Sequence, residues 1–558
     1  MGHYDRPVTE APQTVTASIP GPLRSAVEER VAQLVEQEIP ARLRSGDPTI
    51  WGPAGTPEVA NRLGWLTIAE RMAPQLAQLE QFAAGVAADG IVDAVVLGMG
   101  GSSLAPEVLR RTFPGRPDRP RLWVLDSTDA GEIGAVQDAI DPKRALFVVS
   151  SKSGGTIEPN SLFAHFFALV GDGANFAAVT DPGTSLQELA ERHGFRGVFA
   201  GDPDIGGRYS ALSAFGIVPA TLAGVDTAVL LEDAPAAWDT GLETTGWAGN
   251  APGVDAACWL GAALSALASG GRDKLTFVIS ETLPGLGLWL EQLVAESTGK
   301  QGRGILPVAE EPLGEPGVYG EDRVFAHLVD GGHPEPETQA RVDALAAAGH
   351  PVITIPTTGP GDLGRVFLLA ELAVAVSGWG LEINPFDQPN VQQAKDATNA
   401  VLKGFEQSGR LPEIADAEIA TVSSLLLGSK APEYVALMAY VRPSEDFDLA
   451  AAELREVIRA ANRATTTFGY GPRFLHSTGQ FHKGGPKIGR FLQILHDDPV
   501  DADIPGAPYS FTTLKNAQAT GDLETLRSLG RPAERVRLTG DDPAGALRSL
   551  TATIKEGL

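Results

Sequence analysis

The stretch IVDAVVLGMGGSSLAPEVL, residues 91–109, decides the fold of this chain. Its apolar run from Val92 to Leu97 predicts a buried strand of a parallel sheet, and the glycines that follow predict a tight turn. Two serines and then Pro106 stand where a helix would begin. A strand, turn and helix of this kind leave backbone N–H groups unpaired at the positive end of the helix. We therefore expect the turn to bind a phosphate group.

The glycine pattern of this turn limits which phosphate compound it binds. Gly98-Met-Gly-Gly has neither the full G-x-G-x-x-G spacing of a dinucleotide site nor the Gly-Lys-Ser/Thr of a nucleotide P-loop. The ligand therefore need not be a dinucleotide or ATP. The alternative is a glycine turn that serves only close packing between strand and helix.

The composition excludes several classes of partner. The chain has 558 residues, 43% of them hydrophobic and 20% charged, which predicts a globular protein of two to four domains. Asp and Glu number 70 against 44 Lys and Arg, and the net charge of -26 repels nucleic acid and anionic membrane surfaces. The single cysteine, Cys258, excludes an internal disulfide framework and is typical of a reducing cytoplasm. We expect no signal peptide and no membrane span.

Strand-like and helical segments alternate along two blocks of the chain, which predicts βαβ units and two parallel sheets covered on both faces. We expect four domain-sized parts: an N-terminal arm to about residue 18 with a helical lead-in (1–88), two doubly wound α/β domains (89–235 and 236–400), and a mixed C-terminal region (401–558). The predicted strands are 121–128, 145–156, 174–183, 197–202, 274–281, 323–330, 350–357 and 433–441; the predicted helices include 130–140, 158–170, 185–193, 255–268, 285–297, 362–376 and 448–465.

A serine- and glycine-rich segment follows the predicted strand at 145. Ser151, Lys152, Ser153 and Thr156 place hydroxyls and an ammonium at the carboxyl end of a strand, where open α/β sheets bind ligands. The segment therefore predicts a second phosphate-binding loop. Its simpler explanation is a helix cap before Glu158, although a cap does not call for several serines around a lysine.

Two further segments carry charged groups beside glycines. Arg208 directly follows two glycines, and a guanidinium held close to backbone can stabilise an oxyanion or hold an anionic ligand. Gln292 and Glu296 share one face of a predicted helix, and Glu296 lies at its end, where a carboxylate can act as a base. A surface ion pair for Arg208 and a solvated acid for Glu296 are the simpler alternatives.

The segments near residues 388 and 476 add amide, lysine and histidine side chains. Pro389 is expected at a first helical position, which would bring Gln388 and Lys395 to roughly one face. His476 and His482 lie in a glycine-rich basic stretch that predicts a rigid functional loop. A zinc site is the alternative, but this histidine spacing with one distant cysteine is a poor ligand set, and we expect no metal.

Taken together, these segments resemble the glucose-6-phosphate isomerase (phosphoglucose isomerase) family. The resemblance rests on GMGGSSLAP, SKSGGT, GGRYSALS, AESTGK and NPFDQPNVQQAK, in this order over roughly residues 60 to 400. ESTGKQGRGILPV and GPRFLHSTGQFHKGGP are most similar to the isomerase half of transaldolase/glucose-6-phosphate isomerase fusions. Only about ninety residues precede the isomerase region, too few for a transaldolase barrel, so we expect no second activity.

The resemblance implies two sugar-isomerase (SIS) domains with the active site between them, usually completed by a dimer partner. It implies that Arg208 stabilises an enediolate, that Glu296 moves the proton between C1 and C2, and that Lys395 assists ring opening with a histidine. The positions implied to hold the substrate and its 6-phosphate are Gly101, Ser102, Ser151, Lys152, Ser153, Thr156, Gln292 and Gln388.

The ring-opening histidine is where this chain departs from the family pattern. In the family it falls between the glutamate and lysine motifs, in a Gly-Gln-His setting that His327, His333 and His350 lack here. HSTGQFH reproduces the His-x3-Gln spacing but follows Lys395 in the chain. We therefore assign ring opening to His476, with His482 as the alternative, acting within one subunit or across two.

The resemblance implies reversible isomerisation of glucose 6-phosphate and fructose 6-phosphate through a cis-enediolate, a step of glycolysis and gluconeogenesis. This chemistry needs a base, an oxyanion stabiliser and a phosphate-binding group but no cofactor. The alternatives are an isomerase that also accepts mannose 6-phosphate and a non-catalytic sugar-phosphate-binding protein. We expect a cytoplasmic homodimer.

Overall fold

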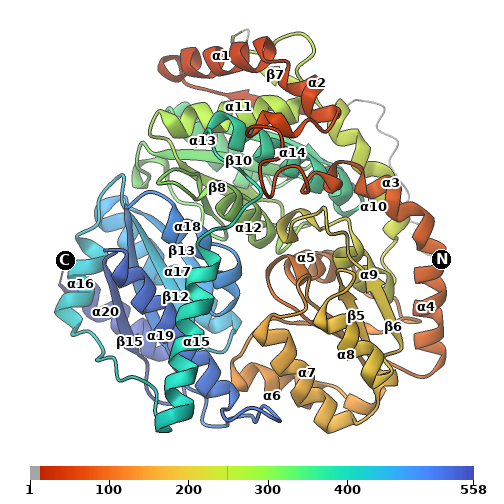
Figure 1. Ribbon diagram of the computed structural model, residues 1–558. Coiled ribbons are helices and arrows are strands. Elements are labelled where there is room, and N and C mark those ends of the chain that lie inside the picture. The colour runs from red at the N-terminus through yellow and green to blue at the C-terminus, as the bar shows by residue number, and fades with distance from the viewer. Residues whose placement is uncertain (1–12, 248, 558) are drawn as a thin grey trace.

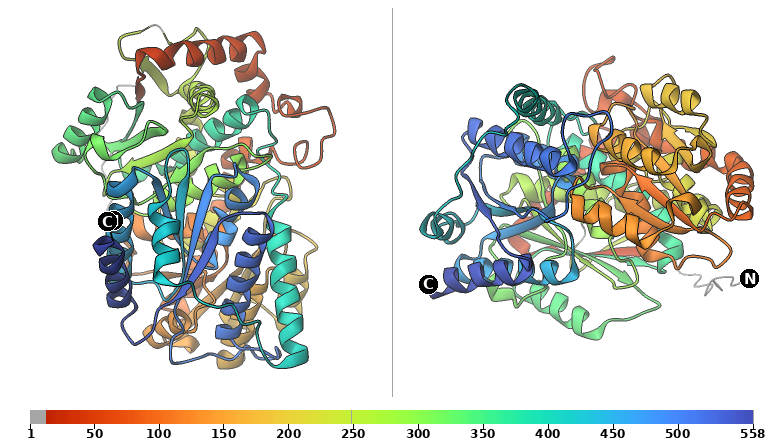
Figure 2. Two further views of the ribbon diagram at one scale, coloured as in Figure 1. Left: turned by 90° about the vertical axis from the view of Figure 1, so that its left-hand side faces the viewer. Right: turned by 90° about the horizontal axis from the view of Figure 1, so that it is seen from below.

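The computed structural model describes residues 13–247 and 249–557. The chain forms three β-sheets of five, six and four strands, each packed against helices. In Figure 1 the six-stranded sheet lies at the top, the five-stranded sheet at the lower right and the four-stranded sheet at the lower left, and Figure 2 shows the same three units from two further sides. The predicted α/β class with parallel sheets is confirmed, and the C-terminal region adds a third parallel sheet.

The five-stranded sheet has the order β3-β2-β4-β5-β6, and all of its strands are parallel. β2 (Asp93–Leu97) lies inside this sheet and every one of its residues is buried, as an apolar run between two helical layers requires. The predicted strands and helices occur here within three residues of their expected ends, except that the strand predicted at 145–156 ends at Ser150. The other elements are β3 (Arg121–Leu125), β4 (Ala145–Ser150), β5 (Phe176–Thr180), β6 (Gly197–Ala200), α5 (Leu104–Thr112), α6 (Ala130–Ala139), α7 (Ile157–Val170), α8 (Ser185–His193), α9 (Ala214–Ala223) and α10 (Thr227–Asp233).

The six-stranded sheet has the order β7-β1-β11-β10-β8-β9 and is parallel except where β1 meets β11. Its strands are β1 (Thr14–Ser18), β7 (Gly241–Thr244), β8 (Lys274–Ile279), β9 (Leu306–Val308), β10 (Arg323–Asp330) and β11 (Val352–Thr357). Its helices are α11 (Ala256–Ser269), α12 (Leu286–Thr298), α13 (Pro336–Ala347) and α14 (Leu363–Gly380).

The expected loose N-terminal arm is wrong at residues 14–18. These residues form β1, which joins the sheet built mainly by residues 241–357. Val15 and Ala17 are fully buried while their neighbours are partly exposed, which is the alternation of a strand with one covered face. The segment is short and rich in threonine, so only pairing with a distant strand reveals it. The rest of the predicted arm, residues 1–12, lies outside the described residues.

The C-terminal region, expected as a mixed addition, forms a four-stranded parallel sheet of order β13-β12-β14-β15. The predicted helix at 448–465 is wrong at its end, because it stops at Asn462 and Thr465 begins β13. The elements are β12 (Tyr434–Tyr440), β13 (Thr465–Tyr470), β14 (Gly489–Leu495), β15 (Ala533–Arg537), α15 (Val391–Ser408), α16 (Ile419–Leu427), α17 (Glu445–Asn462), α18 (Gly479–Gly484), α19 (Phe511–Ser528) and α20 (Pro543–Glu556).

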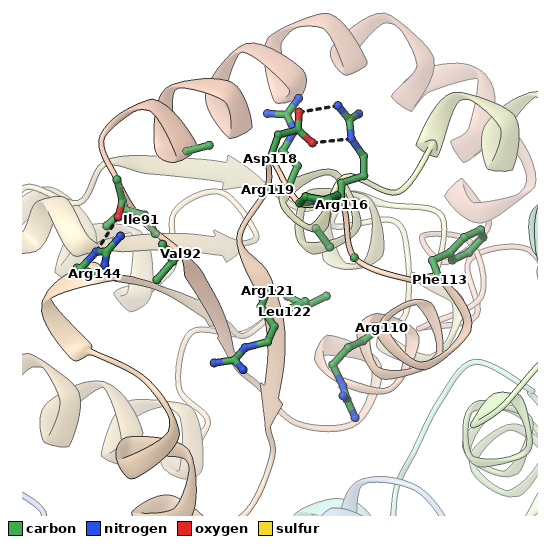
Figure 3. A pocket seen from close by; sticks show the side chains of 15 residues that line it. Ile91, Val92, Arg110, Phe113, Arg116, Asp118, Arg119, Arg121, Leu122 and Arg144 are labelled. Carbon is green, nitrogen blue, oxygen red and sulfur yellow. Dashed lines mark hydrogen bonds and ion pairs between the residues drawn. The ribbon is translucent and has the colours of Figure 1, made fainter. Parts of the chain in front are cut away.

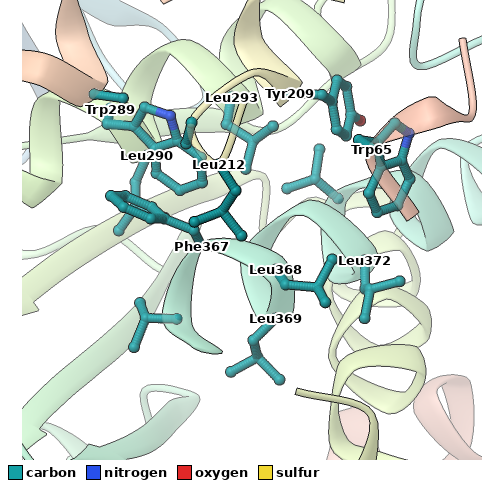
Figure 4. Packing of buried hydrophobic residues seen from close by; sticks show 14 of the residues in the cluster. Trp65, Tyr209, Leu212, Trp289, Leu290, Leu293, Phe367, Leu368, Leu369 and Leu372 are labelled. Atoms are coloured by element: carbon teal, nitrogen blue, oxygen red, sulfur yellow. The ribbon is translucent and has the colours of Figure 1, made fainter. Parts of the chain in front are cut away.

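The largest hydrophobic core lies between the five-stranded and six-stranded sheets. Figure 4 shows its aromatic side chains, among them Trp289 and Phe367, whose ring centroids are 4.7 Å apart, and Trp65 and Tyr209, which are 5.0 Å apart. Large buried rings contribute most of the apolar area that such a core removes from water. The helices that precede β2 in the chain are α1 (Gly21–Glu36), α2 (Ile39–Arg44), α3 (Ile68–Met72) and α4 (Leu76–Ala88).

Helix α14 runs through this core. The segment Pro360–Gly380 is long and apolar enough to cross a membrane, but 89% of its most apolar window is buried inside the protein. It is the one such helix among the residues that the structure describes. Its composition is therefore explained by burial in the core.

Arg365 and Glu371 are the charged residues of α14, and only Glu371 lacks a hydrogen-bond partner among the described residues. Its side chain is fully buried, and neither carboxylate oxygen has a hydrogen-bond partner in the described part of the chain. Burial raises the pKa of Glu371 well above its usual range, because the charged form loses its hydration. The folded protein thus holds a neutral acid where the unfolded chain carries a charge. The resulting cost to stability increases as the pH rises above the unfolded pKa.

We expect Glu371→Gln to stabilise the protein, since the amide stays neutral in both states. The gain in unfolding free energy should grow by up to about 1.4 kcal/mol per pH unit between pH 5 and pH 7. Urea denaturation across this pH range measures it, with Glu524→Gln on the exposed face of α19 as the control. A gain that does not change with pH would show that Glu371 is already charged in the folded protein.

Candidate active site

The glycine turn after β2 lets three other segments approach it. Gly100 has a φ of +55°, and a Cβ there would lie 2.8 Å from the Gln292 side-chain amide and 2.9 Å from the His476 carbonyl. A Cβ on Gly101 would lie 1.9 Å from the Gly207 carbonyl. Side chains at these positions would separate the segments, so the glycines are required for close packing here. Ser102, the last residue of the short 3-10 helix Gly100–Ser102, is buried beside it.

Arg208 and Glu296 form the buried charged centre of the site. Arg208 is 2% exposed and Glu296 is 6% exposed, and their side chains approach to 3.5 Å between Nη1 and Oε1. Arg208 also donates from Nε to the Ser297 hydroxyl at 2.8 Å. Arg208 is therefore not in a surface ion pair, and Glu296 is not a solvated acid, which were the simpler explanations of these two residues.

Arg208 also holds the loop before α15. It donates to the carbonyls of Pro385 and Asp387 at 2.6 and 3.0 Å and to the Gln388 side-chain oxygen at 3.1 Å. The expectation that Gln388 shares a helix face with Lys395 is wrong, because α15 begins only at Val391. Gln388 reaches the centre from a loop that the arginine fixes.

Lys300 is a second cation at this centre, and the sequence analysis assigned it no role. Its ammonium donates to the Asp387 carbonyl and carboxylate at 2.5 and 2.8 Å and is almost fully buried. Burial and the charge of Arg208 lower the pKa of Lys300 to about 8. Burial raises the pKa of Glu296, while Arg208 and Lys300 act in the opposite direction.

Gln292 joins the charged centre to the histidine loop. Its side-chain N–H group donates to Glu296 Oε2 at 3.1 Å and to the His476 carbonyl at 2.9 Å. The spacing of four residues does place Gln292 and Glu296 on one face of α12. Gln292 Oε1 is buried and has no hydrogen-bond partner in the described part of the chain.

The serine-rich loop lies between β4 and the N-terminus of α7. Ser151 donates its hydroxyl to Thr156 at 3.1 Å, and Thr156 is the N-cap residue of α7 without capping it through its side chain. Lys152 forms an ion pair with Asp181 and donates to the Asp202 carbonyl at 3.1 Å. Ser153 is exposed. The helix-cap alternative therefore does not explain the hydroxyls, and the Lys152 ammonium is already engaged by protein groups.

His476 points at a buried carboxylate. Its Nε2 lies 3.0 Å from Glu158 Oε1, and Gln518 donates to the same oxygen at 2.7 Å. Gln518 in turn accepts from the Thr128 hydroxyl at 2.8 Å. Burial alone would raise the pKa of Glu158, but His476 and Lys395 outweigh it and the pKa is lowered. The carboxylate is thus charged and fixes the orientation of the imidazole.

A pocket of about 90 Å³ opens beside this pair. Its lining includes Thr156 of the serine-rich loop, Lys395 of α15 and His476. Lys395 and His476, which lie far from the serine-rich loop in the sequence, therefore line the same pocket as Thr156 of that loop. Lys395 is exposed and stands at the rim of the pocket.

His482, the alternative ring-opening residue, lies elsewhere. It is 3% exposed in α18 and packs among the rings of Tyr434, Phe474 and Phe491. Neither ring nitrogen has a hydrogen-bond partner among the described residues, and burial lowers the pKa of His482 well below its usual value. An uncharged histidine in an aromatic cluster has a structural role.

Buried ion pairs hold the His476 loop against the first sheet. Arg473 donates to both carboxylate oxygens of Asp126, which follows β3, at 2.6 to 2.9 Å, and Ser103 donates to the same carboxylate at 2.9 Å. Lys515 of α19 contacts Asp129 at 2.9 Å. These contacts hold the C-terminal sheet and the five-stranded sheet together at this point.

Sequence reasoning missed several members of the site. Glu158 was considered only as the partner of a helix cap, and Lys300 was quoted in a motif without a role. Gln518 and Arg473 carried no local signal, because their partners lie 360 and 347 residues away in the chain. Among the described residues, no group of three or more His, Cys, Asp or Glu side chains could hold a metal ion.

Known proteins share long stretches of this sequence. Residues 68–332 match the family model of phosphoglucose isomerase. The glucose-6-phosphate isomerase of Citrifermentans bemidjiense is 31% identical over 389 residues, 60% of this chain and 72% of the relative. The enzyme of that name from Rubrobacter xylanophilus is 32% identical over 371 residues, 56% of this chain and 83% of the relative.

Two solved structures share the fold. A hypothetical protein from Thermus thermophilus superposes with a TM-score of 0.56 at 26% identity and covers 69% of this chain and 99% of its own. A glucose-6-phosphate isomerase from Chlamydia trachomatis superposes with a TM-score of 0.51 at 19% identity and covers 69% and 86%. The family-model match ends at residue 332, before Lys395 and His476.

We expect Asp126→Asn to destabilise the protein strongly, because Arg473 would lose its carboxylate inside the protein. Breaking a buried pair from one side costs about 3–5 kcal/mol. Urea denaturation measures the loss, and hydrogen exchange should rise across residues 473–484. The control is Asp118→Asn, which breaks the exposed pair with Arg116 and should change neither readout. Equal effects of the two variants would contradict the role of the Asp126 pair.

Proposed function

The chain belongs to the phosphoglucose isomerase family and is an aldose–ketose isomerase, and we propose that it interconverts glucose 6-phosphate and fructose 6-phosphate at the centre formed by Glu296, Arg208 and His476. One observation carries the assignment of the site. Within one chain, Glu296 is paired with Arg208, and Gln292 links Glu296 to the backbone carbonyl of His476, whose imidazole meets Glu158.

Glu296 moves the proton between the two reacting carbons. Burial raises the pKa of Glu296, which makes it a stronger base than a solvated carboxylate, while Arg208 and Lys300 act on this pKa in the opposite direction. When Glu296 accepts the proton it becomes neutral, so Arg208 is released from this ion pair. The guanidinium can then stabilise the negative oxygen of the cis-enediolate, because the substrate has taken over the charge that Glu296 lost. The net charge of the centre is unchanged through the step.

His476 opens the sugar ring. Ring opening removes a proton from the anomeric hydroxyl and gives one to the ring oxygen, which a single imidazole can do in sequence. Glu158 holds the imidazole in one orientation and balances the positive charge that it gains. Lys395, at the rim of the same pocket, supports this step by stabilising the developing anomeric oxyanion.

The 6-phosphate is bound at the N-terminus of α7. The hydroxyls of Ser151, Ser153 and Thr156 and the first N–H groups of the helix supply donors to an anion. Lys152 contributes through its backbone and through its charge, since its ammonium is bound to Asp181. The substrate is positioned by Gly101, Ser102, Gln292 and Gln388.

We assign two sugar-isomerase domains to residues 89–235 and 236–400, a helical lead-in to 1–88 and a C-terminal domain to 401–558. The sequences of residues 296–308 and 471–486 favour a relation to the isomerase half of transaldolase/glucose-6-phosphate isomerase fusions. The C-terminal domain supplies His476 to a carboxylate of its own chain. We therefore propose a homodimer in which each subunit carries a complete site, acting in the cytoplasm, where the single cysteine stays reduced.

The proposal predicts that Glu296→Gln stops isomerisation and leaves ring opening intact. Removal of a general base should lower kcat by about 10³-fold with little change in KM. Coupled assays measure conversion of fructose 6-phosphate, and magnetisation-transfer NMR measures exchange between the anomers of glucose 6-phosphate. Isomerisation at the wild-type rate in this variant would contradict the role of Glu296.

His476→Ala should slow ring opening, and conversion of the cyclic sugar phosphate should fall with it. We expect anomer exchange to fall by about 10²-fold or more, because the proton shuttle to the ring oxygen is lost. The control is His482→Phe, which fills the same aromatic cluster and should change both rates by no more than a few-fold. If His482→Phe abolishes anomer exchange and His476→Ala preserves it, the assignment of the histidine is wrong.

A further inference from the structure

An open pocket of about 780 Å³ is used by none of the proposed steps. Five arginines line it, and Figure 3 shows Arg110, Arg121 and Arg144 extending toward its open space from different elements. Arg116 and Arg119 belong to the loop between α5 and β3. One acidic side chain, Asp118, is among the lining residues.

This pocket is separate from the candidate active site. Ile91 and Val92 precede β2, Arg121 is the first residue of β3, and Arg144 directly precedes β4. The glycine turn, Asp126 and the serine-rich loop follow the same three strands. The pocket therefore lies at the amino edge of the five-stranded sheet and the active site at its carboxyl edge, separated by the length of the strands. A five-residue strand spans about 17 Å.

The arginines keep hydrogen-bond donors for a ligand. Arg110 pairs with Glu107 and Arg116 with Asp118 through Nε and Nη2, so Nη1 of each has no partner among the described residues. Arg121 likewise uses Nε and Nη2, on Asp93 and the Ala139 carbonyl.

Arg144 forms no ion pair in the described part of the chain. Its Nε donates to the Gly90 carbonyl at 3.2 Å, and its side chain is exposed. Its positive charge is therefore balanced by no carboxylate of the described residues. A guanidinium group without a carboxylate partner gains most from binding an anionic ligand.

The rest of the lining is apolar. Phe113 is partly exposed at one side of the pocket, and Val92 is 40% exposed beside Leu122. Phe113 is among the residues that line the pocket, and it also packs against the hydrophobic core. Such a wall can cover the planar or carbon part of a ligand while its charged part meets the guanidinium groups. The volume is in the range of sites for small organic molecules.

We propose that this pocket binds a nucleoside polyphosphate, with its phosphates on the arginines and its base against Phe113. Several guanidinium groups in fork geometry fit adjacent phosphates, and one isolated phosphate would leave most of them unused. The net charge of -26 repels free anions. Four of the five arginines are paired with the carboxylates of Glu107, Asp118, Glu80 and Asp93, so Arg144 supplies the unpaired positive charge of the pocket among the described residues. The binding should weaken as the salt concentration rises.

Isothermal titration of the full chain with ATP, inorganic tripolyphosphate and adenosine tests this site, in the presence of saturating glucose 6-phosphate so that the active site is occupied. We expect ATP to bind more tightly than tripolyphosphate and adenosine not to bind measurably. The double variant Arg116→Gln/Arg144→Gln should weaken ATP binding by about tenfold or more. Both side chains are exposed, so an unchanged thermal midpoint should show that the variant is folded.

The matched control is Arg548→Gln, which removes an arginine from an exposed ion pair far from the pocket and should leave ATP binding unchanged. No ATP binding by the wild-type chain, or equal binding by the double variant, would overturn the proposal. Tripolyphosphate binding as tight as that of ATP would overturn the part played by Phe113. Loss of ATP binding when glucose 6-phosphate is present would place the nucleotide in the active site instead.

Discussion

The buried ion pair between Arg473 and Asp126 is the contact on which the site depends. It joins the loop that carries His476 to the end of β3, and because the Asp126 carboxylate is buried and Arg473 is mostly buried, water weakens the pair little. With that loop in place, the His476 imidazole meets Glu158 and its carbonyl meets Gln292. One interaction between the C-terminal sheet and the first sheet therefore brings the ring-opening group to the proton-transfer group.

The charges of the site are arranged so that each one is balanced before and after the proposed reaction. Arg208 and Lys300 share the Asp387 carbonyl and both lie near Glu296, which lowers the cost of keeping a carboxylate away from water. Proton transfer moves a negative charge from Glu296 to the substrate without adding one. The protein provides this balance by fixed groups, so little reorganisation is needed when the charge moves.

Features set by neighbouring residues could be predicted from the sequence, and features that depend on pairing with distant residues could not. The strands of the five-stranded sheet, the strands β8, β10 and β11 of the six-stranded sheet, and the shared face of Gln292 and Glu296 follow from hydrophobic period and helix geometry, which act within a few residues. β1 and the loop position of Gln388 depend on partners more than a hundred residues away, and no periodicity records them. The pairing of His476 with Glu158 spans 318 residues, so the histidine could be proposed from spacing but its partner could not.

The central claim is that each site is assembled within one chain. Mixing Glu296→Gln and His476→Ala chains by co-refolding tests it directly, because a site shared between subunits would be restored in half of the mixed positions. The account predicts no recovery of fructose 6-phosphate conversion above the sum of the two variants. Recovery to a substantial fraction of the wild-type rate would contradict it, since it would mean that His476 serves the Glu296 of another chain.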